Sequence, residues 1–170
     1  MSNILITGRP GVGKTTLIKK LAEALGDSAG GFYTEETREG GVRTGFSLTT
    51  LDGKHGVLAR VGAEGPHRVG KYAVDLSDLE TIGVPAVRSA VEARGIVLID
   101  EIGRMELFSR TFRNAVVDAL DSICAVVATI QMRSERFLDS VRSRDDVEII
   151  EVTLQNRDLI VESLYSAVRR

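Results

Sequence analysis

The sequence predicts an α/β domain in which a mainly parallel β-sheet lies between layers of helices. Short apolar runs alternate with segments whose apolar residues repeat every three or four positions, which is the pattern of βα units. A glycine-rich stretch at residues 8–13 joins the first apolar run to the first helical segment, and an acidic pair ends a later run at residues 96–101. Both features follow predicted strands, where open α/β sheets bind their ligands.

Length and composition fit one domain over residues 1–170, since 43% of the residues are hydrophobic and 27% are charged. The net charge of −2 gives no basic footprint of a nucleic-acid binder. No apolar run approaches the roughly 20 residues that span a bilayer, and a signal-peptide pattern is missing, so we expect a cytoplasmic protein without membrane contact. Cys124 is the only cysteine, which excludes an intrachain disulfide and favours a small core residue. The oligomeric state does not follow from the sequence, and we favour a monomer.

The first elements are a strand at residues 3–7 and a helix at residues 14–25, and the helix ends at Gly26. The stretch between them, Gly8-Arg9-Pro10-Gly11-Val12-Gly13-Lys14-Thr15, matches the phosphate-binding loop (Walker A) pattern G-x-x-x-x-G-K-[ST]. Glycines let successive backbone N–H groups point at phosphate oxygens, and the helix N-terminus adds partial positive charge. A glycine-rich turn that merely caps a helix is the alternative, and the flanking strand and helix favour a nucleotide site.

In such a loop, Lys14 reaches the β- and γ-phosphates and the Thr15 hydroxyl ligates Mg²⁺. The nucleotide-binding residues that we expect in this segment are Gly8, Arg9, Pro10, Gly11, Val12, Gly13, Lys14, Thr15 and Thr16.

Three short strands are expected at residues 31–36, 43–51 and 56–61, since glycine-containing turn signals separate them. They form an antiparallel extension of the sheet. Four charged residues gather near the first turn: Glu35, Glu36, Arg38 and Arg43. If the hairpin folds over the phosphate loop, these charges touch the triphosphate or Mg²⁺, whereas charges at a hairpin tip are usually only solvated, and the sequence favours neither outcome.

The rest of the chain continues the alternation. Residues 63–77 form a loop with a short strand at 72–74, and a helix over 78–93 is interrupted near Gly83. An amphipathic helix follows at 111–120, with its apolar face on Phe112, Ala115, Val116, Ala119 and Leu120. We then expect a buried strand at 123–127 that ends in residues 128–130, a helix at 134–142, a strand at 147–152 and a closing helix at 158–168.

The acidic pair Asp100-Glu101 follows four apolar residues, as expected for a strand that is buried on both faces (Walker B). Asp100 is suited to hold Mg²⁺, usually through a water, and Glu101 is suited to act as the general base that polarises an attacking water. Capping of the next segment by the two carboxylates is the weaker alternative. Arg104 either neutralises transition-state charge or pairs with an acid such as Glu106.

Polar residues at two further strand ends complete the candidate site. A strand between the loop strand and the acidic strand is common in phosphate-loop proteins, and Thr129 at its tip would then sense the γ-phosphate or position water; a plain strand-ending threonine is an equal alternative. Asn156 and Arg157 follow the last strand, where they contact the nucleotide base or cap the closing helix, and capping is the safer prediction.

Several motifs together resemble the nucleoside-triphosphatase family first described from thermophiles, whose vertebrate members are called cancer-related nucleoside-triphosphatases. They are the phosphate loop, Gly31-Phe32-Tyr33-Thr34-Glu35-Glu36, Arg43-Thr44-Gly45-Phe46, Leu51-Asp52-Gly53, Val69-Gly70-Lys71-Tyr72, Asp100-Glu101-Ile102-Gly103-Arg104-Met105-Glu106-Leu107, and Thr153 with Asn156-Arg157. The resemblance spans nearly the whole chain.

This resemblance implies a P-loop NTPase with a three-layer fold that slowly splits the β–γ bond of several nucleoside triphosphates, ATP, GTP, CTP and UTP among them, with Mg²⁺. It implies phosphate and metal binding by Lys14 and Thr15, metal binding by Asp100 and activation of water by Glu101. Four departures bear on base preference and on the γ-phosphate loop: Arg104 replaces a frequent lysine, Gln155 a frequent glutamate, and Ala128 and Gln131 stand where glycine and proline are common.

Two other functions remain open from the sequence. A kinase that transfers phosphoryl to a small acceptor needs a lid, for which Arg133, Arg136, Arg142 and Arg144 are candidates. A nucleotide-gated binding module would use slow hydrolysis to reset a partner interaction.

Overall fold

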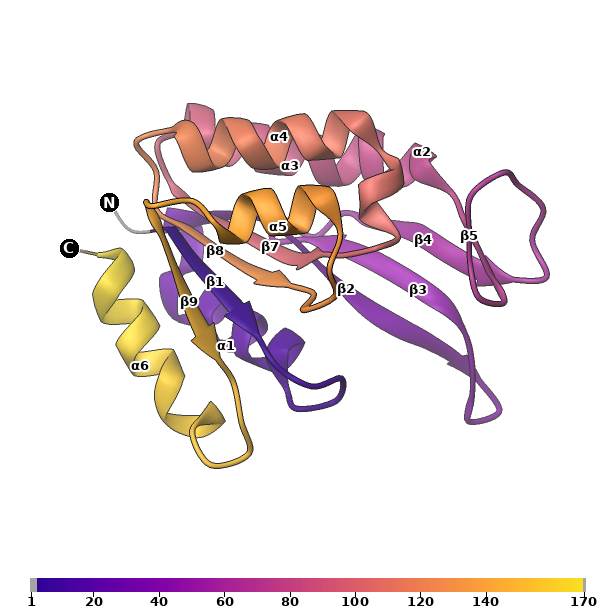
Figure 1. The fold of residues 1–170 in the computed structure, drawn as a ribbon, viewed down its shortest axis with the longest axis horizontal. Helices are drawn as coiled ribbons and strands as arrows, with labels where there is room; N and C mark the ends of the chain where they lie inside the picture. Colours follow the sequence, from indigo (N-terminus) through magenta and orange to yellow (C-terminus); the bar gives the residue numbers. More distant parts are fainter. Residues whose placement is uncertain (1–2, 170) are drawn as a thin grey trace.

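The computed structural model describes residues 3–169, and Figure 1 shows one sheet with helices on both faces. The strands are β1 (Asn3–Thr7), β2 (Ala29–Glu39), β3 (Val42–Thr50), β4 (His55–Val61), β5 (Arg68–Val69), β6 (Tyr72–Val74), β7 (Ile96–Ile102), β8 (Val126–Ile130) and β9 (Val147–Glu151). The α-helices are α1 (Lys14–Leu25), α2 (Leu76–Asp78), α3 (Val84–Glu92), α4 (Arg110–Asp121), α5 (Arg136–Arg142) and α6 (Arg157–Val168). Short 3₁₀ turns cover Gly26–Ser28 and Glu106–Phe108.

Two apolar clusters fill the space between the sheet and its helices. Helices α3, α4 and α5 cover one face, and their buried residues, such as Phe112 and Leu138, pack on Phe32 of β2 and Ile99 of β7. Helices α1 and α6 cover the other face, where the apolar stripe of α1 is buried as its helical spacing predicts. The expected three-layer α/β architecture is therefore confirmed.

The parallel part of the sheet has the order β2-β7-β8-β1-β9. Strand β8 lies between the loop strand β1 and the acidic strand β7, as the sequence predicts. Every residue of β7 except Glu101 is buried, in keeping with a central strand covered on both faces. The loops after β1, β7 and β8 therefore leave the sheet at the same edge.

Beyond β2 the sheet continues as the antiparallel series β3-β4-β6-β5, which confirms the predicted extension. β2 is longer than expected, because Ala29–Phe32 pair with β7 and the rest of the strand continues along β3. The predicted loop at 63–77 contains one additional strand, β5, whose two residues pair with β6. Strand β8 starts three residues later than expected, at Val126, and Cys124 before it is buried as predicted.

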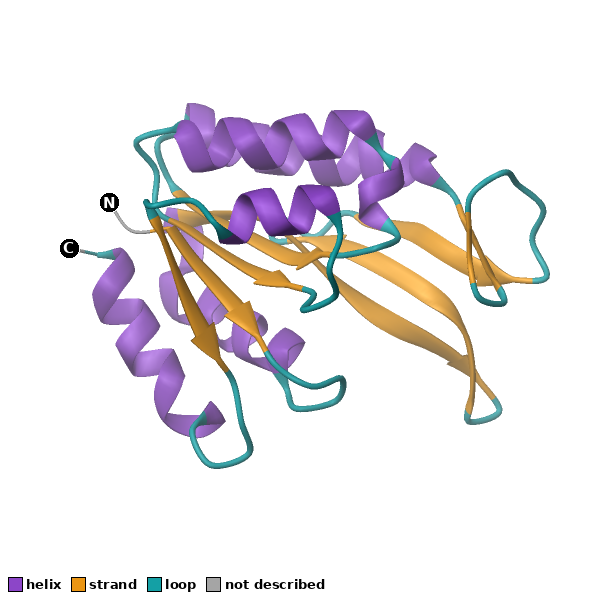
Figure 2. Cartoon of the chain, viewed as in Figure 1, coloured by secondary structure: helices purple, strands orange, loops and turns teal. Residues whose placement is uncertain are grey.

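The helical segment after β6 is one run of α2, a π turn at Leu79–Gly83 and α3, so the interruption predicted near Gly83 is a widened turn. The start of this run, α2 and the π turn, packs on β3 and β4 of the antiparallel extension, and α3 packs on β2 and β7. Figure 2 shows the run on one face of the sheet, together with the loops that join the elements. Within residues 3–169, no helix has the length and apolar character needed to cross a membrane.

The start of α4 offers a stability test, because Ser109 is fully buried there and uses its hydroxyl twice. Its Oγ accepts from Phe112 N at 3.0 Å, capping the helix, and donates to Glu80 Oε1 at 2.6 Å. We expect Ser109→Ala to lower the free energy of unfolding by about 1–2 kcal/mol, since a cap and the partner of Glu80 are lost together. Urea denaturation measures this loss.

The exposed Ser89 within α3 provides the control, because Ser89→Ala replaces a surface helix residue with a better helix former. Equal unfolding free energies for Ser109→Ala and the unmodified protein would contradict the capping role.

Candidate functional site

The predicted phosphate loop lies between β1 and α1, at the carboxyl edge of the sheet. Gly11 and Gly13 have φ angles of 78° and 109°, in the region that glycine adopts without steric cost. Gly13 is the N-cap of α1, and no side chain caps this helix. The first N–H groups of α1 and the positive end of its dipole therefore face the loop, as an anion site requires.

Lys14 lies over the loop that precedes it. Its Nζ donates to the carbonyl oxygens of Gly8 at 2.7 Å and Arg9 at 3.1 Å. The positive charge of Lys14 is thus held beside the N-terminus of α1, which no side chain caps, and it adds to the positive end of the helix dipole.

Asp100 joins three segments of the chain through its carboxylate. Oδ2 accepts from Thr15 Oγ1 of α1 at 2.7 Å and from the Thr34 N–H of β2 at 3.4 Å. Oδ1 accepts from Thr129 Oγ1 of β8 at 2.6 Å. The side chains of Asp100 and Thr15, both predicted as metal ligands, are therefore in direct contact.

Burial controls the protonation of the acidic pair. Asp100 is 2% exposed, and its desolvation raises the pKa, while the hydrogen bonds from Thr129, Thr15 and the Thr34 N–H lower it. Desolvation also raises the pKa of Glu101, and the neighbouring Asp100 charge adds to this, while the hydrogen bond from Gln131 and the Lys14 charge oppose it. Lys14 thus favours the ionised form of both carboxylates.

The donor set here suits a hard divalent cation. Thr15 and Asp100 offer only oxygen, and Mg²⁺ in phosphate-binding enzymes takes one or two protein oxygens and completes its shell with water and phosphate. Among the described residues 3–169, no three or more His, Cys, Asp and Glu side chains converge on a metal site. The oxygen donors of Thr15 and Asp100 fit Mg²⁺ as two of its ligands.

Glu101 is held by the segment that follows β8. Its Oε1 accepts from Gln131 Nε2 at 2.8 Å, and Gln131 Oε1 accepts from the Arg104 N–H at 3.0 Å. The Arg104 side chain is exposed, whereas Glu106 is 3% exposed, and no ion pair links them in the part of the chain that the structure describes. The alternative in which Arg104 pairs with Glu106 or another acid is not observed, because no ion pair of Arg104 is present among residues 3–169.

Glu106 is a third acid in this region. Burial raises its pKa well above the usual value, and the charges of Glu101 and Asp100 raise it further, while backbone N–H groups at Glu106 and Gly103 lower it. The carboxyl group of Glu106 therefore tends to stay protonated where an exposed glutamate is ionised.

The charged hairpin residues are engaged with one another or with α1. Glu35 pairs with Lys19 at 2.7 Å, and Glu36 pairs with Arg38 at 2.8 Å and with Arg43. The contact between β2 and the acidic pair is made by the Thr34 backbone, not by these charges. Of the two sequence interpretations, the structure favours a surface cluster.

Arg157 reaches the phosphate loop, and Asn156 does not. Arg157 Nη1 donates to Val12 O at 3.3 Å, and a pocket of about 220 Å³ beside it is lined by Gly13, Thr16, Leu17, Lys20, Arg157 and Asp158. Asn156 is the N-cap residue of α6 and makes no side-chain cap at that position. In the turn before it, Asn156 Oδ1 accepts from Thr153 N at 2.7 Å and Thr153 Oγ1 accepts from Asn156 N at 3.3 Å, which is the reciprocal pair of a capping box. The segment 153–157 therefore does cap the start of the closing helical region, and Asn156 also donates to Glu151 O.

Thr129 is fully buried, and its hydroxyl faces Asp100. Any part that Thr129 takes in sensing a phosphate therefore acts through Asp100. Two of the four candidate lid arginines have structural partners: Arg142 donates to Arg133 O and Asp139, and Arg144 pairs with Asp121 and Asp146.

Three residues of this site escape sequence reasoning. Thr34 acts through its backbone N–H, which no side-chain pattern indicates. Gln131 is a polar residue directly after a buried strand, and ligands bind at this end of the strands in open α/β sheets. This position in the sequence could therefore have indicated Gln131 as a site residue. The burial of Glu106 has no signature in the sequence, since glutamate in a loop is usually exposed.

Glu106 gives a prediction about stability and pH. In the unfolded chain its carboxyl ionises from about pH 4. The folded chain keeps the Glu106 proton to higher pH than the unfolded chain. The contribution of the protonated carboxyl to the free energy of unfolding is therefore complete below the unfolded pKa and is lost as the pH rises through the folded pKa. Because Glu106→Gln cannot lose a proton, the free energy of unfolding of the variant minus that of the unmodified protein should increase with pH by up to about 1.4 kcal/mol per pH unit.

Chemical denaturation of the metal-free and nucleotide-free protein between pH 4 and pH 8 measures this difference in the free energy of unfolding. Glu92→Gln, at the exposed end of α3, controls for the loss of one surface carboxylate. A difference that is independent of pH would show that the Glu106 carboxyl ionises as an exposed one does.

Known proteins are similar to this chain over nearly its whole length. A family model described as NTPase matches residues 3–165. The nucleoside-triphosphatase THEP1 of Thermotoga sp. (strain RQ2) is 52% identical over 166 residues, which cover 98% of this chain and 95% of that protein. The human cancer-related nucleoside-triphosphatase is 40% identical in an alignment 183 positions long, gaps included, that covers 98% of this chain and 96% of the human protein.

Two solved structures share the fold. The crystal structure of THEP1 from the hyperthermophile Aquifex aeolicus matches with a TM-score of 0.90 and 40% identity over 99% of both chains. The solution structure of the human cancer-related nucleoside triphosphatase matches with a TM-score of 0.85 and 39% identity over 99% of this chain and 98% of the human one. The resemblance that the motifs indicated is confirmed: this chain belongs to the NTPase family of the THEP1 and cancer-related nucleoside-triphosphatases.

Proposed function

We propose that this chain hydrolyses nucleoside triphosphates, with water attacking the γ-phosphate to release a nucleoside diphosphate and phosphate. The observation that carries the proposal is the contact of Thr15 with Asp100 at 2.7 Å, with Glu101 next along β7. It brings a phosphate-loop hydroxyl, a buried carboxylate and a candidate base to one edge of the sheet. The names of the relatives, all nucleoside-triphosphatases, support the same activity.

Phosphate binding falls to the loop and the start of α1. The backbone N–H groups after Gly13 and the Lys14 ammonium would neutralise the β- and γ-phosphates, where negative charge shifts during the reaction. Thr15 and Asp100 would hold Mg²⁺, which supplies charge neutralisation to the phosphates when it is bound. Arg104 is exposed beside the acidic pair and can add a further positive charge.

Glu101 would orient and polarise the attacking water. Its carboxylate is half-buried at the end of β7. Burial and the Asp100 charge raise the pKa of this carboxyl, which makes it a stronger base, while the Gln131 hydrogen bond and the Lys14 charge favour the ionised form that accepts a proton. Because phosphoryl transfer depends mainly on positioning and charge, a base that is fixed in place adds more than a base that is strong.

The base of the nucleotide would lie toward Arg157 and the pocket beside Thr16 and Lys20. The cationic side chains of Arg157 and Lys20 can contact any base or ribose, because they form no set of hydrogen bonds that distinguishes one base from another. We therefore propose that the protein uses ATP, GTP, CTP and UTP without strong preference. From the family resemblance we also propose a slow rate of hydrolysis, and we propose that the protein acts in the cytoplasm.

Replacement of the base is the first test. We expect Glu101→Gln to lower kcat by about 10²–10⁴-fold, because the amide cannot take a proton from water, and to leave nucleotide affinity near normal. The measurement is phosphate release from each of the four triphosphates with Mg²⁺, together with the Kd of a non-hydrolysable analogue.

Glu148→Gln, at an exposed position on the edge strand β9, is the matched control. Turnover of Glu101→Gln at the normal rate would remove Glu101 from the mechanism. Release that requires an added nucleoside or nucleoside monophosphate, with the phosphate found on that acceptor, would indicate a kinase.

Loss of the loop lysine should act on binding. Lys14→Ala removes a charge-assisted contact to phosphate that is worth about 1.5–3 kcal/mol, so we expect the Kd of the analogue to rise about tenfold to a hundredfold. Isothermal titration calorimetry measures the Kd. Lys54→Ala, in the turn between β3 and β4, serves as the control, and equal affinities in the two variants would contradict the assignment of Lys14.

A further inference from the structure

Gln131 is the feature of this edge that neither the motifs nor the proposed chemistry uses. It follows the last residue of β8, and its side chain touches both Glu101 and the segment after β7. We propose that Gln131 is a positioning residue for the reaction, which fixes the direction of the Glu101 carboxylate toward the attacking water. This inference rests on the proposed function, since it assigns to Glu101 the role of base.

The hydrogen bonds determine how the Gln131 amide is oriented. The backbone N–H of Arg104 can only donate, so the atom that it meets at 3.0 Å is the Gln131 oxygen. The amide NH₂ is then turned to Glu101 Oε1, which it meets at 2.8 Å. One carboxylate oxygen of Glu101 is engaged in this way, and among residues 3–169 no hydrogen bond engages the other, which in this proposal accepts from the attacking water.

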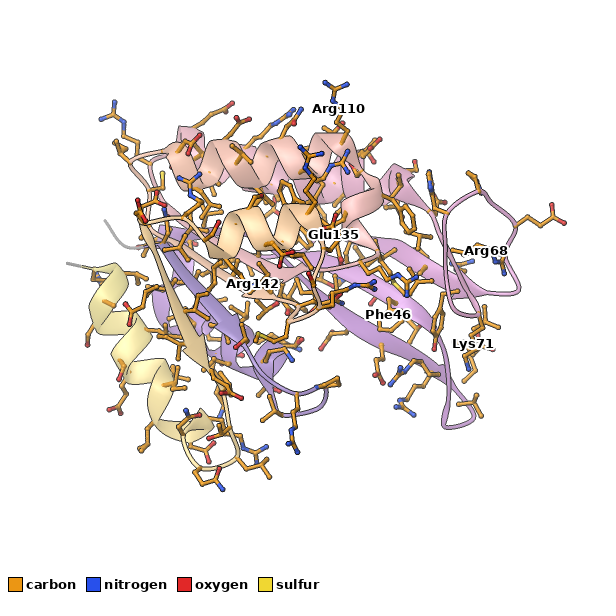
Figure 3. The ribbon with its side chains drawn as sticks, viewed as in Figure 1. Phe46, Arg68, Lys71, Arg110, Glu135 and Arg142 are labelled. Atoms are coloured by element: carbon orange, nitrogen blue, oxygen red, sulfur yellow. The ribbon has the colours of Figure 1, made fainter. Side chains whose placement is uncertain are left out.

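The backbone of Gln131 is itself anchored on two sides. Its N–H donates to Ile102 O of β7 at 3.2 Å, which extends the contact of the two strands beyond their regular pairing. Its carbonyl accepts from Arg142 Nη1, and Arg142 Nη2 donates to Arg133 O at 3.0 Å. Figure 3 marks Arg142 and Glu135 on the two ends of α5, so the loop before α5 is clamped by the far end of that helix.

Gly103 leaves the space that this contact needs. A Cβ at this position would lie 2.7 Å from Gln131 Nε2 and 2.8 Å from Glu101 Oε1, closer than side-chain carbons come to such atoms. The absence of a side chain at Gly103 and the amide of Gln131 therefore belong to one arrangement around the Glu101 carboxylate.

This arrangement has a kinetic consequence. Without the amide, the Glu101 carboxylate can rotate away from the water while the phosphate loop, Lys14 and Thr15 are unchanged. Misplacement of a catalytic group by about 1 Å can cost a hundredfold in rate. Gln131 should therefore affect kcat and leave KM and nucleotide affinity alone.

The test compares Gln131→Leu and Gln131→Glu with the unmodified protein. Leucine keeps the bulk and loses both hydrogen bonds, and we expect kcat to fall about tenfold to a hundredfold with KM unchanged. Glutamate keeps the length and the contact to the Arg104 N–H but cannot donate to Glu101, so its kcat should be at least as low. Met132→Ala, exposed in the same loop, is the control and should keep the normal kcat.

A double variant separates positioning from a general structural role. Since Gln131 acts through Glu101, Gln131→Leu should cause no further loss of kcat in a Glu101→Gln background. A loss of equal size in both backgrounds, or a normal kcat for Gln131→Leu or Gln131→Glu, would overturn the inference. If Glu101→Gln alone turns over normally, the assignment of the base fails instead, and the two failures are thereby distinguished. Denaturation midpoints and analogue binding show that each variant is folded.

Discussion

The buried carboxylate of Asp100 is the constraint on which the rest of the structure depends. A carboxylate that is 2% exposed is costly unless hydrogen bonds compensate for lost water, and its three donors come from α1, β8 and β2. Each donor can reach Asp100 only if its element has the observed place in the sheet. The strand order β2-β7-β8-β1 and the position of the phosphate loop are therefore coupled to the chemistry of a single side chain.

Strand β2 shows how this constraint shapes the unusual half of the sheet. Its first residues pair with β7, which brings the Thr34 N–H to Asp100, and the strand then continues beyond the end of β7 alongside β3. The antiparallel extension is thereby tied to the carboxyl edge of the parallel sheet. Four charged residues of its first hairpin, Glu35, Glu36, Arg38 and Arg43, pair with one another or with Lys19, and the contact of the extension with Asp100 is the Thr34 backbone donor.

The sequence predicts those parts of the site that neighbouring residues form, and it does not predict the parts that depend on contacts between distant segments of the chain. The loop at residues 8–15 and the pair Asp100-Glu101 are local patterns, and their flanking apolar runs were enough to predict both the strands and the common edge. Thr34 and Gln131 join the site through contacts between strands that are far apart in the chain, and β-strand register is not a local property. Glu106 entered the sequence analysis only as an ion-pair partner for Arg104, because its burial depends on how the turn at Glu106–Phe108 packs, which no residue pattern records.

The electrostatics of the finished site explain why phosphate and cation should bind together. Burial raises the pKa of Asp100, Glu101 and Glu106; the Asp100 charge raises the pKa of Glu101 further, and the charges of Glu101 and Asp100 raise that of Glu106, while the Lys14 charge lowers the pKa of Asp100 and Glu101. A triphosphate alone would add further negative charge to a region in which burial already disfavours carboxylate ions. Under the proposed function, a divalent cation that enters with the phosphates would remove this repulsion and, by its charge, would lower the pKa of the acids that face it. The buried acids and Lys14 would then favour the complex of nucleotide and metal over the nucleotide alone.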